Sequence, residues 1–151
     1  MLRHCSMKSV ANTGRFAAGE AMSLVVTRDA ALVELVRRSC PFPWLVESRD
    51  DWRRIGETVR TRHVRVVVFD DDAVPEGNRS ELIDNIHTWF PDVLIIYVAG
   101  QHSQMVERSA RASGVLCYTS KPIEAERLEH LLRSLSHRLT ESSGTLRSNK
   151  D

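Results

Sequence analysis

Five short apolar segments recur along the chain, and each is followed by a segment whose apolar residues return every three or four positions. Short apolar runs are typical of buried strands, whereas the spacing of three and four is typical of amphipathic helices. The pattern therefore predicts five strands that alternate with five helices. The apolar segments are residues 23–26, 44–46, 64–69, 93–98 and 115–118.

The helical segments carry their own start and stop signals. Ser48 and Asp51 have the spacing of a capping box before the second helix. Pro91 stops the third helix and Gly114 the fourth, because proline cannot continue a helix and glycine commonly ends one. A leucine stripe from Leu128 to Leu139 marks the fifth. Alternating strands and helices predict an α/β fold, a doubly wound five-stranded parallel sheet covered on both faces.

The two ends of the chain lack this pattern. Residues 1–21 are rich in small and polar types and predict a flexible leader, whereas residues 140–151 predict a polar tail or the start of a linker. The patterned domain is therefore expected at residues 22–139.

Composition narrows the class of protein. The chain has 151 residues and a formal charge of +1, so there is no strong overall attraction to nucleic acid or membrane. The cysteines at 5, 40 and 117 have no metal-like spacing, and an odd, sparse set favours a reducing compartment. No apolar run approaches the roughly 20 residues of a membrane span. We therefore expect a cytoplasmic protein.

Three aspartates follow directly after the third strand, in the segment "FDDD". Neighbouring carboxylates repel one another unless water, a cation or a basic side chain offsets their charge. In doubly wound sheets, ligands bind at the carboxyl ends of the strands. Asp70, Asp71 and Asp72 therefore predict either a solvated loop or a site that holds a metal or accepts a phosphoryl group.

The chain from residue 22 to 139 resembles the receiver domain of two-component response regulators. The likeness is carried by "FDDDAVP" after the third strand, by "YTSKP" with Lys121 and Pro122 after the fifth, and by Tyr118 at the position of the family's switch aromatic. The resemblance implies a flavodoxin-like sheet with the strand order 2-1-3-4-5.

In that family, an acidic pair after the first strand binds Mg²⁺, a third-strand aspartate is the phosphoryl acceptor, and a hydroxyl and a lysine bind the phosphoryl oxygens. Lys121 matches this set. The chain departs from it with Thr27 and Arg28 in place of the acidic pair, followed only by Asp29, and with Val98 in place of the hydroxyl. These departures predict a degenerate site.

Two residues remain candidates for the acceptor position. The end of the strand favours Asp70, and counting back from Pro75 favours Asp71; we prefer Asp70. Arg28 is a fixed cation that could pair with Asp70 in place of Mg²⁺. In the other interpretation, Arg28 points to solvent.

These features favour a pseudo-receiver that is not an enzyme, needs no cofactor and acts as a protein-interaction or dimerisation module. Its interaction face is expected at residues 102–139, which include Tyr118.

One alternative is a genuine acceptor with a histidine kinase partner, which uses Asp70 or Asp71 and Mg²⁺ held by carboxylates among Asp29, Asp70, Asp71 and Asp72. A further alternative is a DNA-contacting regulator that uses the arginine-rich residues 49–65, although a solvated face is favoured there. Trp52 and Trp89 are expected to pack in the core.

Overall fold

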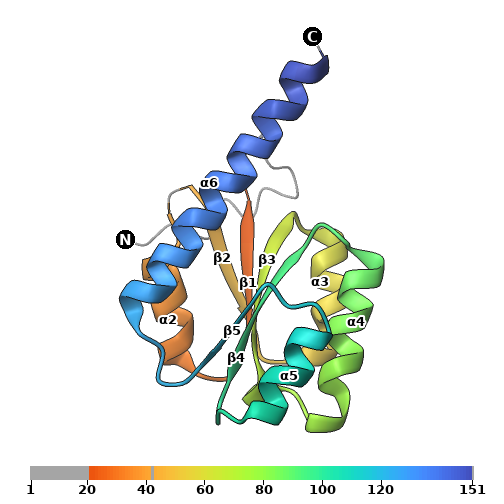
Figure 1. Ribbon diagram of the computed structural model, residues 1–151, viewed down its shortest axis with the longest axis vertical. Helices are drawn as coiled ribbons and strands as arrows, with labels where there is room; N and C mark the ends of the chain where they lie inside the picture. Colours follow the sequence, from red (N-terminus) through yellow and green to blue (C-terminus); the bar gives the residue numbers. More distant parts are fainter. Residues whose placement is uncertain (1–20, 42, 151) are drawn as a thin grey trace.

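A computed structural model describes residues 21–41 and 43–150, with side chains as far as residue 139. Its centre is a five-stranded sheet with the order β2-β1-β3-β4-β5, in which every pair of neighbours is parallel (Figure 1). The predicted fold class and strand order are therefore confirmed. The strands are β1 (Met22–Val26), β2 (Leu45–Arg49), β3 (Val64–Asp70), β4 (Leu94–Ala99) and β5 (Cys117–Ser120).

Helices cover both faces of this sheet. Helices α2 and α6 lie against one face, and α3, α4 and α5 lie against the other (Figure 1). The α-helices are α2 (Ala30–Ser39), α3 (Ile55–Thr61), α4 (Arg79–Trp89), α5 (Gln104–Ala112) and α6 (Ala125–Lys150). Three 3-10 turns are η1 (Trp52–Arg54), η2 (Asp71–Ala73) and η3 (Glu76–Asn78).

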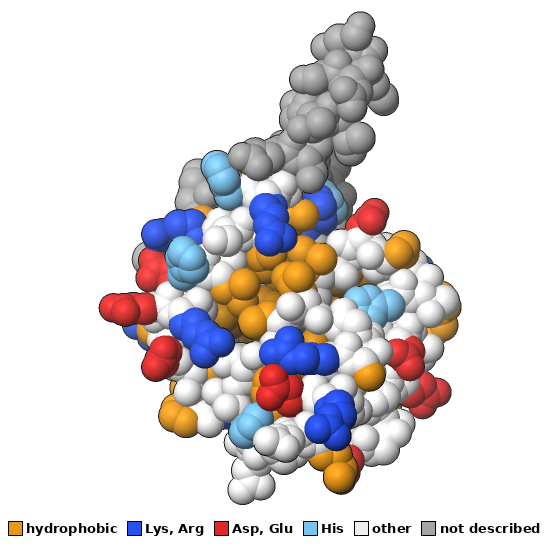
Figure 2. All heavy atoms as spheres, viewed as in Figure 1, with side chains coloured by type: hydrophobic (Ala, Val, Ile, Leu, Met, Phe, Trp, Pro, Cys, Tyr) orange, Lys and Arg blue, Asp and Glu red, His pale blue; other side chains and the backbone are white. Residues whose placement is uncertain are grey.

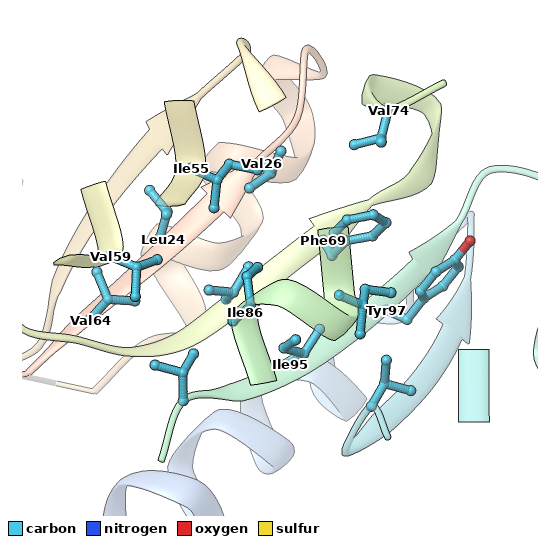
Figure 3. Close-up of a cluster of buried hydrophobic side chains, with 14 of the residues drawn as sticks. Leu24, Val26, Ile55, Val59, Val64, Phe69, Val74, Ile86, Ile95 and Tyr97 are labelled. Atoms are coloured by element: carbon cyan, nitrogen blue, oxygen red, sulfur yellow. The ribbon is translucent and has the colours of Figure 1, made fainter. Parts of the chain in front are cut away.

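The core is divided into two clusters by the sheet, because successive side chains of a strand point to opposite faces. Phe69 and Tyr97 belong to the cluster under α3, α4 and α5 (Figure 3), whereas Val68 and Val98 pack with Leu132 beneath α2 and α6. Strands that are buried on both sides need apolar residues at consecutive positions. This requirement explains the uninterrupted apolar runs in β3 and β4.

The strand register brings several chain segments to one edge of the sheet. Val26 of β1 is level with Phe69, and Asp70 is level with Val98, which in turn is level with Thr119 of β5. The segments that follow β1, β3, β4 and β5 therefore emerge side by side. The acidic residues lie at this edge, which is formed by the carboxyl ends of the strands.

Some local predictions differ from the structure. Helix α4 ends at Trp89, just before Pro91, and the side chain of Trp89 faces outward; the residue is 61% exposed, so its predicted place in the core is wrong. Trp52 is partly buried and packs against the core, as predicted. Asp51 caps the turn η1 through the backbone N–H of Arg53, whereas Ser48 belongs to β2.

The predicted domain limits fall partly outside the described residues. The leader at 1–20 lies there, and so does Asp151. Helix α6 continues through residues 140–150, where the sequence predicts a polar tail or the start of a linker (Figure 1). In the part of the chain that the structure describes, none of the helices combines the length and apolar character that crossing a membrane requires.

Candidate functional site

The three consecutive aspartates, which we call the acidic cluster, differ sharply in their access to solvent. Strand β3 ends at Asp70, whose carboxylate accepts the backbone N–H of Asp72 at 3.1 Å and so begins the turn η2. The side chains of Asp70 and Asp71 are only 1% and 5% exposed, whereas that of Asp72 is 62% exposed. A reagent in solution therefore meets Asp72 first, whereas the two candidate acceptors are buried.

Asp70 is held between the ends of β1 and β5. One of its carboxylate oxygens accepts a hydrogen bond from the hydroxyl of buried Thr27 at 2.5 Å and another from the ammonium of Lys121 at 3.0 Å. Thr27 also accepts the backbone N–H of Asp29 at 2.9 Å. The hydroxyl that stands in place of an acidic residue therefore bonds directly to the favoured acceptor.

Lys121 is the cation that contacts several carboxylates at the carboxyl edge of the sheet. Besides Asp70, its ammonium lies 3.3 Å from Asp29 and 3.5 Å from Asp72. Partial burial opposes the charge of Lys121, but the hydrogen bond and negative charge of Asp70, together with those of Asp29, raise its pKa above the usual 10.5. Burial also opposes the charge of Asp29, yet the hydrogen bond from Lys121 and backbone N–H groups of α2 lower its pKa. One ammonium thus contacts all three carboxylates and offsets part of their charge.

Asp71 faces the opposite side of the sheet and meets a different set of donors. One oxygen accepts the backbone N–H of Gly100 at 2.9 Å, and the other accepts the hydroxyl of Tyr97 at 2.8 Å. The guanidinium of Arg79, at the start of α4, lies 3.8 Å from that second oxygen. Burial, and then the hydrogen bond to Asp71, raise the pKa of Tyr97. The phenol therefore stays neutral and acts as a donor.

Arg28 does not form the predicted pair with Asp70. The residue is exposed, and among the described residues the cation that contacts Asp70 is Lys121. The reason is the alternation along the chain end of β1: Thr27 points inward to Asp70, so its neighbour points outward. The alternative interpretation, with Arg28 directed to solvent, describes the structure.

Gly100 provides the space in which Asp72 lies. A Cβ atom at position 100 would come within 2.2 to 2.4 Å of the carboxylate of Asp72. Real Cβ atoms do not approach other heavy atoms so closely, and any side chain here would push the Asp72 carboxylate away from Lys121. The glycine that follows β4 therefore helps to keep this carboxylate over the buried site.

The acidic cluster has the geometry of a possible cation site, since ligand atoms of its three carboxylates lie within 4.8 Å of one another. Mg²⁺ prefers such oxygen ligands. However, the described donors already engage the carboxylate oxygens of Asp70 and Asp71, and the Lys121 ammonium lies among Asp29, Asp70 and Asp72. The residues present therefore do not fit a magnesium ion unless Lys121 is displaced.

An aromatic row starts beside the cluster and was missed from the sequence. Phe69, Tyr97 and Tyr118 are level with one another on neighbouring strands, and their rings stack in sequence. The hydroxyl of Tyr118 lies 3.0 Å from Nδ1 of His102. Val98 has no hydroxyl, but its neighbour Tyr97 supplies one on the opposite face of the sheet. A tyrosine inside the otherwise apolar run of β4 was the signal for this contact, because a buried phenol needs a partner.

Comparison with known proteins supports the fold. No protein-family model matches the chain, and no curated protein matches it by sequence. Among solved structures, a response regulator receiver domain from Methanospirillum hungatei is 18% identical, with a TM-score of 0.68 over 82% of this chain and 98% of that one. The signal receiver domain of an HD domain-containing protein from Pseudomonas fluorescens is 23% identical, with a TM-score of 0.66 over 80% and 98%.

A response regulator from Thermotoga maritima is similar in the same way, with 17% identity and a TM-score of 0.66 over 78% of this chain and 96% of that one. This chain thus has the receiver-domain fold over nearly the whole length of these structures. At such identities the likeness shows the fold alone, and the chemistry has to be argued from the residues of the site.

Proposed function

We propose that the chain is a receiver-like module of two-component signalling that works without phosphorylation, as a protein-binding or dimerising domain. The observation that carries this proposal is the position of Lys121, whose ammonium is within 3.5 Å of Asp29, Asp70 and Asp72. A phosphoryl acceptor has to be open to its donor and has to be helped by a cation that offsets the incoming charge. Here both candidate acceptors are buried, and the available cation is already engaged.

The first prediction is that wild-type protein gains no phosphoryl group from acetyl phosphate and Mg²⁺. Attack by Asp70 or Asp71 would require breaking hydrogen bonds that bury these carboxylates, and Mg²⁺ would have to displace Lys121. Intact-mass measurement after incubation tests this. A stable gain of one phosphoryl group that is lost in Asp70→Asn or Asp71→Asn would overturn the proposal.

One observation favours a second candidate function, that of a genuine phosphoryl acceptor supplied by a histidine kinase. The cluster does gather three carboxylates, and Asp72 offers an exposed one. In this alternative, Mg²⁺ displaces Lys121 and binds carboxylates among Asp29, Asp70, Asp71 and Asp72. The same mass measurement decides between the two functions, because only the alternative yields a modified aspartate.

The proposed interaction face consists of residues 102–139, which form α5, β5 and the first part of α6. Strand β5 lies at the edge of the sheet, and the face carries partly exposed apolar side chains beside it. Figure 2 shows hydrophobic side chains gathered in the middle of this side of the molecule, with Lys and Arg side chains around them. Leu116 is 39% exposed, and Cys117, Ile123 and Leu131 are only partly buried. An apolar centre with a charged rim is typical of protein-binding surfaces.

The second prediction is that this face mediates constitutive self-association. Tyr118→Ala removes a ring that packs beneath the face, and Arg133→Glu reverses a charge on α6 whose side chain is 68% exposed. Each change should weaken association about tenfold or more, the effect typical of the few residues that carry most of the binding energy of an interface. Light scattering across a concentration series measures this. A wild-type protein that stays monomeric at every concentration would exclude self-association and leave a different protein as the partner.

A matched pair of charge reversals tests whether association depends on this face. Arg108→Glu reverses a charge on α5, within the proposed face, whereas Arg54→Glu makes the same reversal on η1, which follows β2 at the opposite end of the strand order from β5. Association should fall in the first variant and stay unchanged in the second. Equal loss in both would indicate a general charge effect instead of an interface.

This proposal includes a cytoplasmic location and a role as a binding module instead of an enzyme, in keeping with the receiver fold. It does not favour DNA contact. Within the arginine-rich residues 49–65, Arg53 pairs with Asp51, and both Arg49 and Arg62 pair with Glu47. These ion pairs reduce the positive charge available to phosphates, so a solvated face remains the favoured interpretation.

A further inference from the structure

We infer that Tyr97 is a positioning residue that links the buried carboxylate of Asp71 to the interaction face, and that this link holds Tyr118 in its inward position. The inference rests on the proposed function, because the link between Asp71 and Tyr97 is proposed to hold the interaction face in one conformation. It gives the two adjacent aspartates separate tasks: Asp70 binds the cation Lys121, and Asp71 binds the phenol of Tyr97.

The link begins at a well-anchored acceptor. Asp71 is fixed from one side by the backbone N–H of Gly100 at 2.9 Å and is approached from another by Arg79 at 3.8 Å. The hydroxyl of Tyr97 donates to its second oxygen at 2.8 Å. A hydrogen bond to an ionised acceptor is stronger than one between neutral groups. The carboxylate therefore fixes where the phenol lies.

The link continues through stacked rings. The centroid of the Tyr97 ring lies 5.3 Å from that of Phe69 and 5.7 Å from that of Tyr118, with interplanar angles of 29° and 19°. Tyr97 and Tyr118 are 4% and 7% exposed. Beyond them, the Tyr118 hydroxyl lies 3.0 Å from the ring of exposed His102, at the border of the interaction face. Each group along this path therefore contacts the one before it.

The space beside Tyr97 gives the link a second available state. A cavity of about 200 Å³ lies between α4 and α5. Its wall includes the ring of Tyr97 and the side chains of Arg79, Met105 and Val106. A ring that is released from Asp71 has room to turn toward this cavity, where it no longer supports Tyr118. The hydrogen bond thus selects one of two arrangements that the packing permits.

The position of the link explains why the missing hydroxyl at Val98 need not disconnect the site from the face. Val98 and Tyr97 are consecutive residues of β4 and point to opposite faces of the sheet. Asp70 and Lys121 lie on the side with Val98, opposite the face on which Tyr118 packs. The side with Tyr97 carries Asp71 and the aromatic row.

A comparison of three single variants in the full chain tests this inference. Tyr97→Phe removes the hydroxyl and keeps the ring; Asp71→Asn removes the charged acceptor; Asp70→Asn makes the same chemical change one residue earlier, on the other face. The readouts are the aromatic NMR signals of the Tyr118 and His102 rings and the exchange rates of the β5 backbone amides.

We expect Tyr97→Phe and Asp71→Asn to shift both ring signals and to speed β5 amide exchange about tenfold, in keeping with the loss of a hydrogen bond to a charged group. Asp70→Asn should leave both readouts unchanged apart from any uniform change in global stability, which urea titration measures. Ring signals that are unchanged in Tyr97→Phe, or that shift equally in Asp70→Asn, would overturn the inference.

The outcome is separable from that of the proposed function. Gain of a phosphoryl group in the wild type contradicts that function but leaves the link between Asp71 and Tyr97 intact. An unshifted Tyr118 signal in a well-folded Tyr97→Phe variant contradicts the link, while the wild type can remain unmodified and associated. If Asp71→Asn does not fold, Tyr97→Phe alone still decides, because it removes a single atom and preserves the stacking.

Discussion

Lys121→Ala is expected to destabilise the fold by about 3–5 kcal/mol, since removing one partner of a buried ion pair leaves an uncompensated charge. The carboxylate of Asp70 has a side-chain exposure of 1% and would retain only hydrogen bonds from Thr27 and a backbone N–H. Asp29 and Asp72 would then repel it without an intervening cation. Urea denaturation of the variant and the wild type measures the difference in the free energy of unfolding.

Arg28→Ala is the matched control for this prediction. It removes a cation from the same edge of the sheet, but an exposed one, so its effect should stay within about 0.5 kcal/mol. Adding Mg²⁺ should stabilise Lys121→Ala and not the wild type, because only the variant leaves a vacant position for a cation among the carboxylates. A denaturation midpoint that Lys121→Ala leaves unchanged would remove the basis of the proposed function.

The difference in the free energy of unfolding between the wild type and Lys121→Ala should change with pH in a direction that the pKa of Lys121 determines. The pKa of Lys121 is raised in the folded protein above its usual 10.5. Its stabilising effect is therefore fully present below that usual value and is lost as the pH rises through the raised one. The wild type and Lys121→Ala should thus converge in stability at strongly alkaline pH.

Thr27→Asp is the second change with a large expected effect. Thr27 is buried and bonds to Asp70 at 2.5 Å, so a carboxylate in its place would put two like charges in contact away from water. We expect a loss of about 3–5 kcal/mol in the absence of divalent cations, in the range for an unpaired buried charge. Mg²⁺ at about 100 times its Kd should return about 2.7 kcal/mol of this loss.

Two comparisons make this prediction specific. Thr27→Asn has a similar size without the charge, so it should be insensitive to Mg²⁺. Arg28→Asp adds a carboxylate at the next position, which is exposed, and should be tolerated with little loss. Denaturation midpoints with Mg²⁺ and with a chelator separate these cases. A Thr27→Asp variant that is stable in the chelator and does not respond to Mg²⁺ would show that position 27 is not part of the cation site.

The fold of this chain could be predicted from its sequence because its determinants are local and repeated. The apolar runs of β3 and β4 are uninterrupted, as burial on both faces requires, and Pro91 and Gly114 mark where helices end. The acidic cluster could also be placed at the carboxyl edge, because the end of an apolar run fixes where a strand stops. Trp89 was misplaced, since helical spacing near the last residue of a helix does not determine which way a side chain faces.

Which groups meet at the site was decided only by the tertiary structure. Whether Arg28 or Lys121 is the partner of Asp70 could not be predicted from the sequence. The answer depends on the direction in which the side chains point at the end of each strand. The same alternation turns Asp70 and Asp71 to opposite faces, one to Lys121 and one to Tyr97. The sequence determined which side chains reach this edge, and contacts between residues as far apart as Thr27, Asp70 and Lys121 determined their partners, because only folding brings those segments together.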